Sequence, residues 1–108
     1  MLGGILWIAL GVLSAPLRVV CFNGHWCGAC AAQAPAWQRF ARAHTEAVLV
    51  DVDQPQSSAY RRYGFLWEKE RSMPLTVWVS GDRILEQHAG VLSLTELQRI
   101  TRHWGHQL

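Results

Sequence analysis

The sequence predicts a single α/β domain with a mixed central sheet of about four strands flanked by helices. Its 108 residues fit one domain. Half of the residues are hydrophobic and 17% are charged, a composition typical of a folded domain rather than a disordered chain. Short apolar runs rich in β-branched residues alternate with segments of helical periodicity, so we expect strands and helices to alternate.

An apolar leader over residues 1–16 precedes this domain, and no charged side chain occurs before Arg18. A helix over Met1–Leu17 would reach roughly 25 Å, short of the ~30 Å hydrocarbon core of a bilayer. The leader also lacks the basic residues that begin a typical signal peptide. Three interpretations remain open: a signal peptide, a short membrane anchor, or a helix docked on the domain or on a partner. We expect export or membrane attachment, facing an extracytoplasmic compartment, whereas a docked helix would suit a cytoplasmic protein.

The first half of the domain is predicted to form a strand–helix–strand unit. The apolar runs over residues 17–22 and 47–52 are typical of buried strands, and such a unit joins parallel strands by a right-handed crossover. Between them a helix is predicted from Cys27 to about His44, with an expected kink at Pro35. The apolar residues at helical spacing in this helix are Ala31, Ala34, Trp37, Phe40 and Ala41.

A short helix follows the second strand. Ser57 or Ser58 can cap it, and we expect it to run through Tyr63 and to end at Gly64. Residues 65–72 are ambiguous. They can form an extra helical turn, or a flap that faces substrate with Trp67 at its tip.

A hairpin and a last helix complete the predicted order. Strands over 75–79 and 84–88 are joined by a turn at Gly81-Asp82. Ser93, with Glu96 three residues later, forms a capping box at the start of the final helix. One face of that helix carries Leu94, Leu97, Ile100 and Trp104.

Two cysteines separated by two residues stand where the first strand meets the first helix, the end of the sheet that usually carries function. Cys27 is predicted at the helix N-terminus, where unpaired N–H groups and the helix dipole lower the pKa of a thiol. Cys30 lies one turn further on the same face, close enough to close a disulfide. A Cys27 thiolate can therefore attack a substrate disulfide, and Cys30 can resolve the mixed disulfide.

Other chemistries have less support. Zinc needs four ligands, and no second C-x-x-C or H-x-x-x-H pair occurs beside Cys21 and His25, so we predict no metal site. A c-type haem site is excluded because Ala31 stands where a histidine is needed. The ten basic residues are interleaved with eight acidic ones, which argues against a nucleic-acid partner.

A set of motifs in a characteristic order resembles the thioredoxin family over residues 17–108. The motifs are Trp26-Cys27-Gly28-Ala29-Cys30, Pro35, Asp51-Val52-Asp53, Tyr63-Gly64, Met73-Pro74-Leu75-Thr76, Gly81 and Gly90. The resemblance implies a thioredoxin-like fold and a protein-disulfide oxidoreductase that needs no bound cofactor beyond its own dithiol. Its implied partners are protein thiols and disulfides and an electron-donating or electron-accepting redox protein.

The resemblance also implies site roles. Cys27 is the nucleophile and Cys30 the resolving cysteine, and a cis Met73-Pro74 peptide would leave the Met73 backbone free to bind an extended substrate segment. The residues expected to shape the substrate groove are Trp26, Gly28, Ala29, Met73, Pro74 and Gly90.

The sequence departs from the family pattern in several places. Cys21 occupies the strand position where thioredoxins usually carry a buried acid. It can be a small buried hydrophobe, a third redox thiol, or a residue that tunes the pKa of the dithiol. His25 can add positive charge that tunes the pKa of Cys27, or it can be a solvated loop residue. Ala29 replaces the usual proline, and the usual opening strand and helix are missing or replaced by the leader. The alternative function is a thioredoxin-fold binding or chaperone module without redox turnover.

Overall fold

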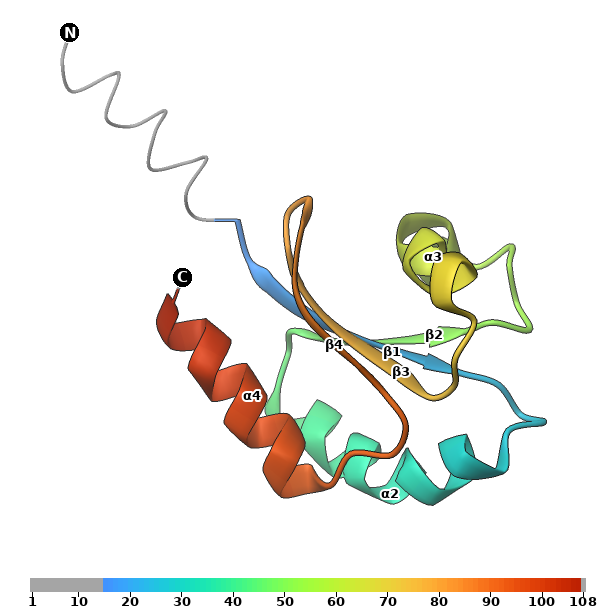
Figure 1. Cartoon of the computed structure of the whole chain (residues 1–108), viewed down its shortest axis with the longest axis horizontal. Coiled ribbons are helices and arrows are strands. Elements are labelled where there is room, and N and C mark those ends of the chain that lie inside the picture. The colour runs from blue at the N-terminus through green and yellow to red at the C-terminus, as the bar shows by residue number, and fades with distance from the viewer. Residues whose placement is uncertain (1–14, 108) are drawn as a thin grey trace, which may run out of the picture.

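The computed structural model describes residues 15–107, and its helices and strands follow the predicted order (Figure 1). The elements are β1 (Leu17–Asn23), α2 (Gly28–Ala43), β2 (Ala47–Asp51), α3 (Ser58–Glu70), β3 (Leu75–Ser80), β4 (Arg83–Ala89) and α4 (Leu94–Gln107). The expectations for the leader lie outside the described residues, apart from Ala15 and Pro16. Among the described helices, none has the length and hydrophobicity that crossing a bilayer requires.

The four strands form one mixed sheet in the order β2-β1-β3-β4. β1 and β2 are parallel, as predicted for a strand–helix–strand unit, and Asn23 pairs with Asp51 at their carboxyl ends. β3 runs antiparallel to both β1 and β4. The carboxyl ends of β1 and β2 therefore lie side by side, at the edge where α2 begins.

Helices cover both faces of the sheet, with α2 and α4 on one face and α3 on the other (Figure 1). β1 is buried on both faces because its side chains alternate: Val19 and Cys21 point toward α2 and α4, while Val20 and Phe22 point toward α3. This explains its continuous apolar run. Trp78 of β3 is also fully buried, and its indole N–H donates to Thr101 Oγ1 of α4 at 3.0 Å.

The helix α3 is longer than predicted, because it continues through Gly64 to Glu70. Gly64 is buried in the helix, and a Cβ there would lie 2.6 Å from the Tyr60 ring, so the glycine makes room for that ring rather than ending the helix. The ambiguous residues 65–72 are mostly helical. Trp67 is half-buried and packs against the sheet, so it does not stand at the tip of a substrate-facing flap. Arg71, with φ of 57°, ends the helix in the left-handed region.

The buried side of α2 differs from the predicted one. It consists of Cys30, Gln33, Trp37 and Phe40, whereas Ala31 and Ala41 are exposed. The prediction that the alanines are buried was wrong for Ala31 and Ala41. The large aromatic side chains determine which face of the helix packs on the sheet, because they bury more apolar area than alanine does. In α4 the predicted capping box is confirmed by two reciprocal bonds: Glu96 N–H donates to Ser93 Oγ at 3.1 Å, and Ser93 N–H donates to Glu96 Oε1 at 3.0 Å.

Candidate active site at the start of α2

Cys27 and Cys30 form a disulfide between the end of β1 and the first turn of α2. Their Cα atoms are 5.2 Å apart, within the usual range for a disulfide. The N–H of Cys27 donates to Gly24 O at 3.1 Å, which closes the turn that leads from the strand into the helix. Cys30 is buried, whereas Cys27 is partly exposed, so Cys27 is the sulfur that a protein partner can reach.

Cys27 is the N-cap residue of α2, and its Sγ accepts a hydrogen bond from the N–H of Cys30 at 3.1 Å. The first turn of the helix carries no acidic side chain that would offset the positive end of the helix dipole. Both features favour negative charge on this sulfur. The structure therefore places Cys27 where a thiolate is stabilised once the disulfide is reduced.

The loop before β3 lies beside the disulfide. The Met73–Pro74 peptide bond is cis, and the N–H of Gly90 donates to Pro74 O at 2.8 Å. Gly90 has a φ of 105°, a conformation that side-chain-bearing residues rarely adopt. Pro74 and Cys30 line the same small cavity, and Gly28 and Ala29 are exposed at the start of α2.

Trp26 and Met73 both pack on Gly24. A Cβ at Gly24 would lie 2.7 Å from Met73 Cε and 3.1 Å from Trp26 Cε2, so a side chain at this buried position would require the Met73 side chain to shift. The Trp26 ring nevertheless remains 62% exposed. The loop thus presents an apolar surface next to the disulfide while its backbone stays closely packed.

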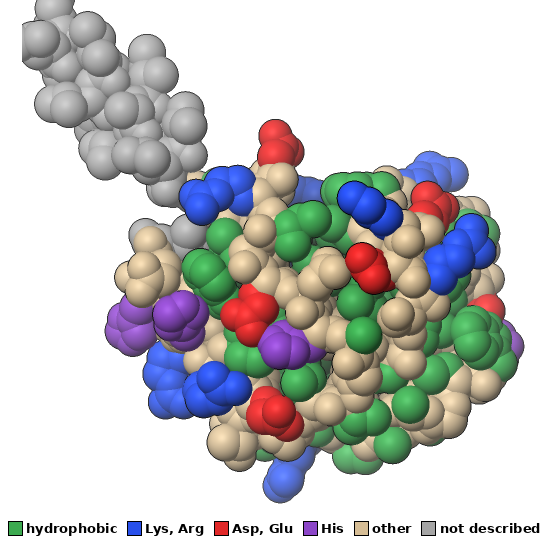
Figure 2. Space-filling model, viewed as in Figure 1, with side chains coloured by type: hydrophobic (Ala, Val, Ile, Leu, Met, Phe, Trp, Pro, Cys, Tyr) green, Lys and Arg blue, Asp and Glu red, His purple; other side chains and the backbone are tan. Residues whose placement is uncertain are grey.

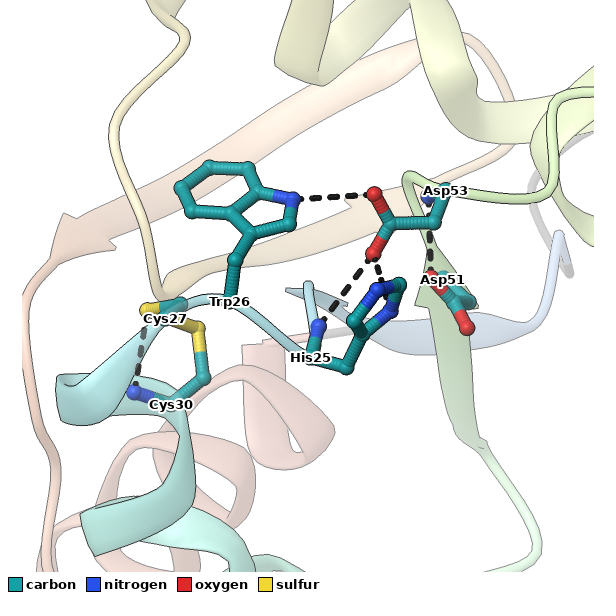
Figure 3. Close-up of polar contacts among 6 residues, drawn as sticks. All are labelled: His25, Trp26, Cys27, Cys30, Asp51 and Asp53. Carbon is teal, nitrogen blue, oxygen red and sulfur yellow. Dashed lines mark hydrogen bonds and ion pairs between the residues drawn. A yellow bond between two sulfur atoms is a disulfide. The ribbon is translucent and has the colours of Figure 1, made fainter.

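Asp53 holds the residues just before the disulfide (Figure 3). Its Oδ1 accepts from the indole N–H of Trp26 at 2.9 Å, and its Oδ2 accepts from the backbone N–H of His25 at 3.2 Å. His25 Nδ1 also lies 2.8 Å from Oδ2, so the imidazole lies beside Asp53 rather than beside the disulfide (Figure 3). The backbone N–H of Asp53 itself donates to Asp51 Oδ1 at 2.9 Å.

The pKa of Asp53 reflects these contacts. Loss of hydration acts to raise it, but the hydrogen bonds from Trp26 and from the His25 backbone, with the attraction of the His25 ring, lower it below its ordinary value. Ligand atoms of His25, Asp51 and Asp53 lie within 4.8 Å of one another. Both carboxylate oxygens of Asp53 accept hydrogen bonds, which hold Trp26 and the backbone of His25 in place.

Cys21 lies in the middle of β1, fully covered by the helices on its side of the sheet. Burial raises its pKa to about 11, despite a hydrogen bond from Gln33 Nε2 to its Sγ at 3.3 Å. Gln33 is itself buried, and its Oε1 accepts from the N–H of Leu92 at 2.7 Å. Cys21, Gln33 and Cys30 line one small cavity of about 130 Å³.

Sequence reasoning missed the roles of Asp53 and Gln33. Asp53 could have been found from its place after β2, because the carboxyl ends of parallel neighbouring strands meet. Gln33 could have been found from spacing, since Cys30, Gln33, Trp37 and Phe40 recur every three or four residues and form one helix face. A polar residue in such a face must find buried partners.

Comparisons with known proteins agree with this geometry. The thioredoxin family model matches residues 11–101. A search of curated proteins found no match by sequence.

Similar solved structures include three thioredoxins from parasites. One is thioredoxin-2 of a malaria parasite, with a TM-score of 0.63 and 19% identity over 81% of this chain and 82% of that one. Another is a Schistosoma mansoni thioredoxin, with a TM-score of 0.61 and 24% identity over 93% and 90% of the two chains. The third is Fasciola hepatica thioredoxin, with a TM-score of 0.57 and 27% identity over 94% and 93%. By its sequence match and its fold, the chain belongs to the thioredoxin family.

Proposed function

We propose that this protein is a thiol–disulfide oxidoreductase that exchanges its Cys27–Cys30 pair with the thiols and disulfides of protein partners. The observation that carries the proposal is the disulfide itself, formed by a half-exposed cysteine at a helix N-terminus and a buried one a turn later. Membership of the thioredoxin family supports protein thiols as the general class of partner.

The reduced form starts the exchange. The Cys27 thiolate attacks one sulfur of a substrate disulfide, forming a mixed disulfide and releasing the other substrate sulfur as a thiolate, which takes up a proton. The Cys30 thiol then loses its proton and its sulfur attacks Cys27 Sγ. This releases the second substrate thiol and leaves the Cys27–Cys30 disulfide. Two electrons pass to the substrate, and a redox partner returns the protein to the dithiol; the reverse sequence oxidises a dithiol.

The surroundings of the two sulfurs give Cys27 and Cys30 different roles in the exchange. The N–H of Cys30 and the helix dipole stabilise negative charge on Cys27, so this sulfur attacks first and leaves readily. Cys30 is buried, so it reacts only after the mixed disulfide has formed at Cys27. Cys21 is protonated at neutral pH because its pKa is about 11, so it does not take the proton of Cys30. That proton passes to the substrate thiolate or to solvent.

We propose that an extended substrate segment binds in a groove beside the disulfide. We assign its walls to Trp26, Met73-Pro74 and Gly90, with Gly28 and Ala29 open at the helix start. The backbone of Met73 offers hydrogen-bonding groups to an incoming chain, as in other cases where a peptide adds along a strand. His25 takes part through Asp53, with which it orients the loop that carries Trp26.

Trapping tests the proposal. In the Cys30→Ser variant the mixed disulfide cannot be resolved, so incubation with a disulfide-bonded protein should accumulate a covalent complex through Cys27. The Cys27→Ser variant is the matched control and should form none. A binding or chaperone module without redox turnover would give no covalent complex with either variant. The equilibrium potential of Cys27–Cys30 against glutathione then shows whether the protein acts as a reductant or an oxidant.

A further inference from the structure

Cys30 lines a small cavity that is bounded by thiols, amides and apolar side chains. The cavity, of about 130 Å³, lies between β1, β2, α2 and the loop before β3. Among the described residues its lining consists of Cys21, Asn23, Cys30, Gln33, Ala34, Trp37, Gln38, Leu49 and Pro74. None of these side chains is a carboxylate, an imidazole or a cation, and the two thiols are the groups that titrate. The ionisation of Cys30 therefore depends on neutral neighbours.

Charged side chains on the surrounding elements are engaged elsewhere. The sequence has no charged residue between Gly28 and Gln38 of α2, and none in β3. In Figure 2 the surface over the first half of α2, at the lower right, consists of hydrophobic and uncharged polar side chains. The titratable groups around this region have other partners: His25 with Asp53, Asp51 with the Asp53 N–H, Arg71 over the Trp67 ring, His88 with Glu86, and Glu96 with Ser93.

Gln33 is the amide at the centre of this cavity wall. It is 2% exposed and lies three residues after Cys30, on the same buried face of α2. Its Oε1 accepts from the backbone N–H of Leu92 at 2.7 Å, and its Nε2 donates to Cys21 Sγ at 3.3 Å. A backbone N–H can only donate, so Leu92 fixes the position of the amide oxygen. The NH₂ end of Gln33 must therefore point toward Cys21 and the cavity.

This NH₂ group has donor capacity to spare. An amide nitrogen carries two N–H bonds, and Cys21 Sγ accepts one of them. Among the described residues no second acceptor is bonded to Nε2, so the other N–H is available to the cavity that Cys30 also lines. In a buried setting a donor of this kind stabilises a nearby anion more strongly than it does in water. Cys21 is itself no anion at neutral pH, because burial raises its pKa to about 11.

We propose that Gln33 is a positioning residue for the resolving step, in which its NH₂ group stabilises the negative charge that forms on Cys30 Sγ. The inference rests on the proposed function. In this step the Cys30 proton passes to solvent or to the substrate thiolate, and Cys30 Sγ bonds to Cys27 Sγ. The bond between Cys27 and the substrate sulfur breaks, and its electron pair leaves on the substrate thiolate. Gln33 takes up no proton and acts as a fixed dipole.

The two sulfurs are thus stabilised by different groups. Cys27 receives the N–H of Cys30 and the positive end of the helix dipole, whereas Cys30 depends on the amide of Gln33. A change at Gln33 should therefore slow the second half of the exchange and leave the first half intact. A purely structural role would not divide the two halves in this way.

Reaction of the reduced full chain with a limiting amount of dithiobis(nitrobenzoate) tests the proposal. Attack by Cys27 releases one coloured thiolate in a first phase, and attack by Cys30 on the mixed disulfide releases the other in a second phase. The rate of the second phase follows the thiolate fraction of Cys30, so its pH midpoint reports the pKa of Cys30.

Gln33→Met keeps the length of the side chain and removes the donor. We expect its second phase to be about tenfold slower at neutral pH, with a pH midpoint about one unit higher, the scale of one hydrogen bond to a charged group. The first phase should change by less than about twofold, because the groups that stabilise Cys27 are retained. An unshifted midpoint overturns the proposal, whatever happens to the rate.

Gln38→Met is the matched control. Gln38 lines the same cavity but is exposed, so both phases should stay within about twofold of the unaltered protein. A midpoint shift equal to that of Gln33→Met would overturn the proposal, because any lost amide would then have the same effect. A missing second phase in the unaltered protein would mean that Cys30 does not resolve, and the proposed function itself would fail.

The side-chain amide signals of Gln33 in nuclear magnetic resonance spectra give a second test without a change at Gln33. In Cys27→Ser these signals should shift as Cys30 titrates. In Cys30→Ser that step should be absent, while any step caused by Cys21 is common to both variants. Identical titrations of the Gln33 amide in the two variants would overturn the proposal and leave the proposed function standing.

Discussion

Cys27 and Cys21 are the same residue type in two settings, and the contrast shows what makes a sulfur reactive. Each sulfur accepts a hydrogen bond from an N–H group, at 3.1 Å from Cys30 N and at 3.3 Å from Gln33 Nε2. The hydrogen bond therefore does not distinguish them. Cys27 is half-exposed at a helix N-terminus, whereas Cys21 is buried in a strand, and burial raises its pKa to about 11. Access and desolvation decide the difference.

The largest expected effect is on turnover. Cys27→Ser should lower disulfide-reductase activity on the order of a thousandfold or more, the scale on which loss of a nucleophile is felt. Cys21→Ala should retain turnover, because Cys21 takes no part in the exchange. Both are measured as rates of reduction of a disulfide-bonded protein. Equal losses in the two variants would mean that Cys21 is a third redox thiol and that burial does not keep it out of the exchange.

A smaller but direct effect concerns alkylation. At neutral pH a pKa of about 11 leaves roughly a hundredfold less thiolate than the ordinary value of 9.0. In the reduced protein, iodoacetamide should therefore modify Cys27 first and Cys21 last, as followed by mass spectrometry of the separate peptides. In concentrated urea the three cysteines should react at similar rates. Equal rates in the folded protein would contradict the assigned burial.

Gln33 should matter for stability. Gln33→Ala removes the donor to Cys21 and leaves the Leu92 N–H without its acceptor, which should cost about 1–3 kcal/mol of unfolding free energy. Gln38→Ala is the matched control, since Gln38 is exposed on the same helix and should change stability by less than ~0.5 kcal/mol. Urea denaturation measures both. Similar small losses would show that Gln33 does not anchor this region.

The smallest expected effect concerns pH. The pKa of Asp53 is lower in the folded protein than its ordinary 3.8, so the unfolded state binds more protons in this range. Its contribution to stability is complete above the ordinary pKa and is lost as pH falls through the lowered one. The stability difference between the protein and Asp53→Asn should therefore be constant near neutral pH and shrink in acid. A difference that grows in acid would reverse the assigned direction.

Asp53→Asn should also loosen Trp26. The indole N–H would keep a weaker acceptor, so the Trp26 ring should become more accessible to fluorescence quenchers, while Cys21 reactivity stays unchanged. A change in quenching of Trp26 without a change at Cys21 would show that Asp53 acts on the exposed loop and not on the buried strand.

Local patterns in the sequence predicted the order of the elements, the capping box of α4 and the pairing of Cys27 with Cys30. These features depend on residues close together in the chain, such as Ser93 and Glu96. The end of α3 could not be predicted in this way. Gly64 is a common helix stop, but its tight fit against the Tyr60 ring and the packing of Trp67 on the sheet outweigh the roughly 1 kcal/mol cost of glycine in a helix.

By itself, then, the sequence determined the α/β alternation and the cysteine spacing, because hydrophobic periodicity and helix geometry act over a few residues. Only the tertiary structure decided that Asp53 binds Trp26 across 27 residues and that Gln33 reaches Leu92 across 59. Those partners meet because strands and helices from distant parts of the chain pack together. Burial, which separates Cys21 from Cys27, likewise exists only once those elements have packed.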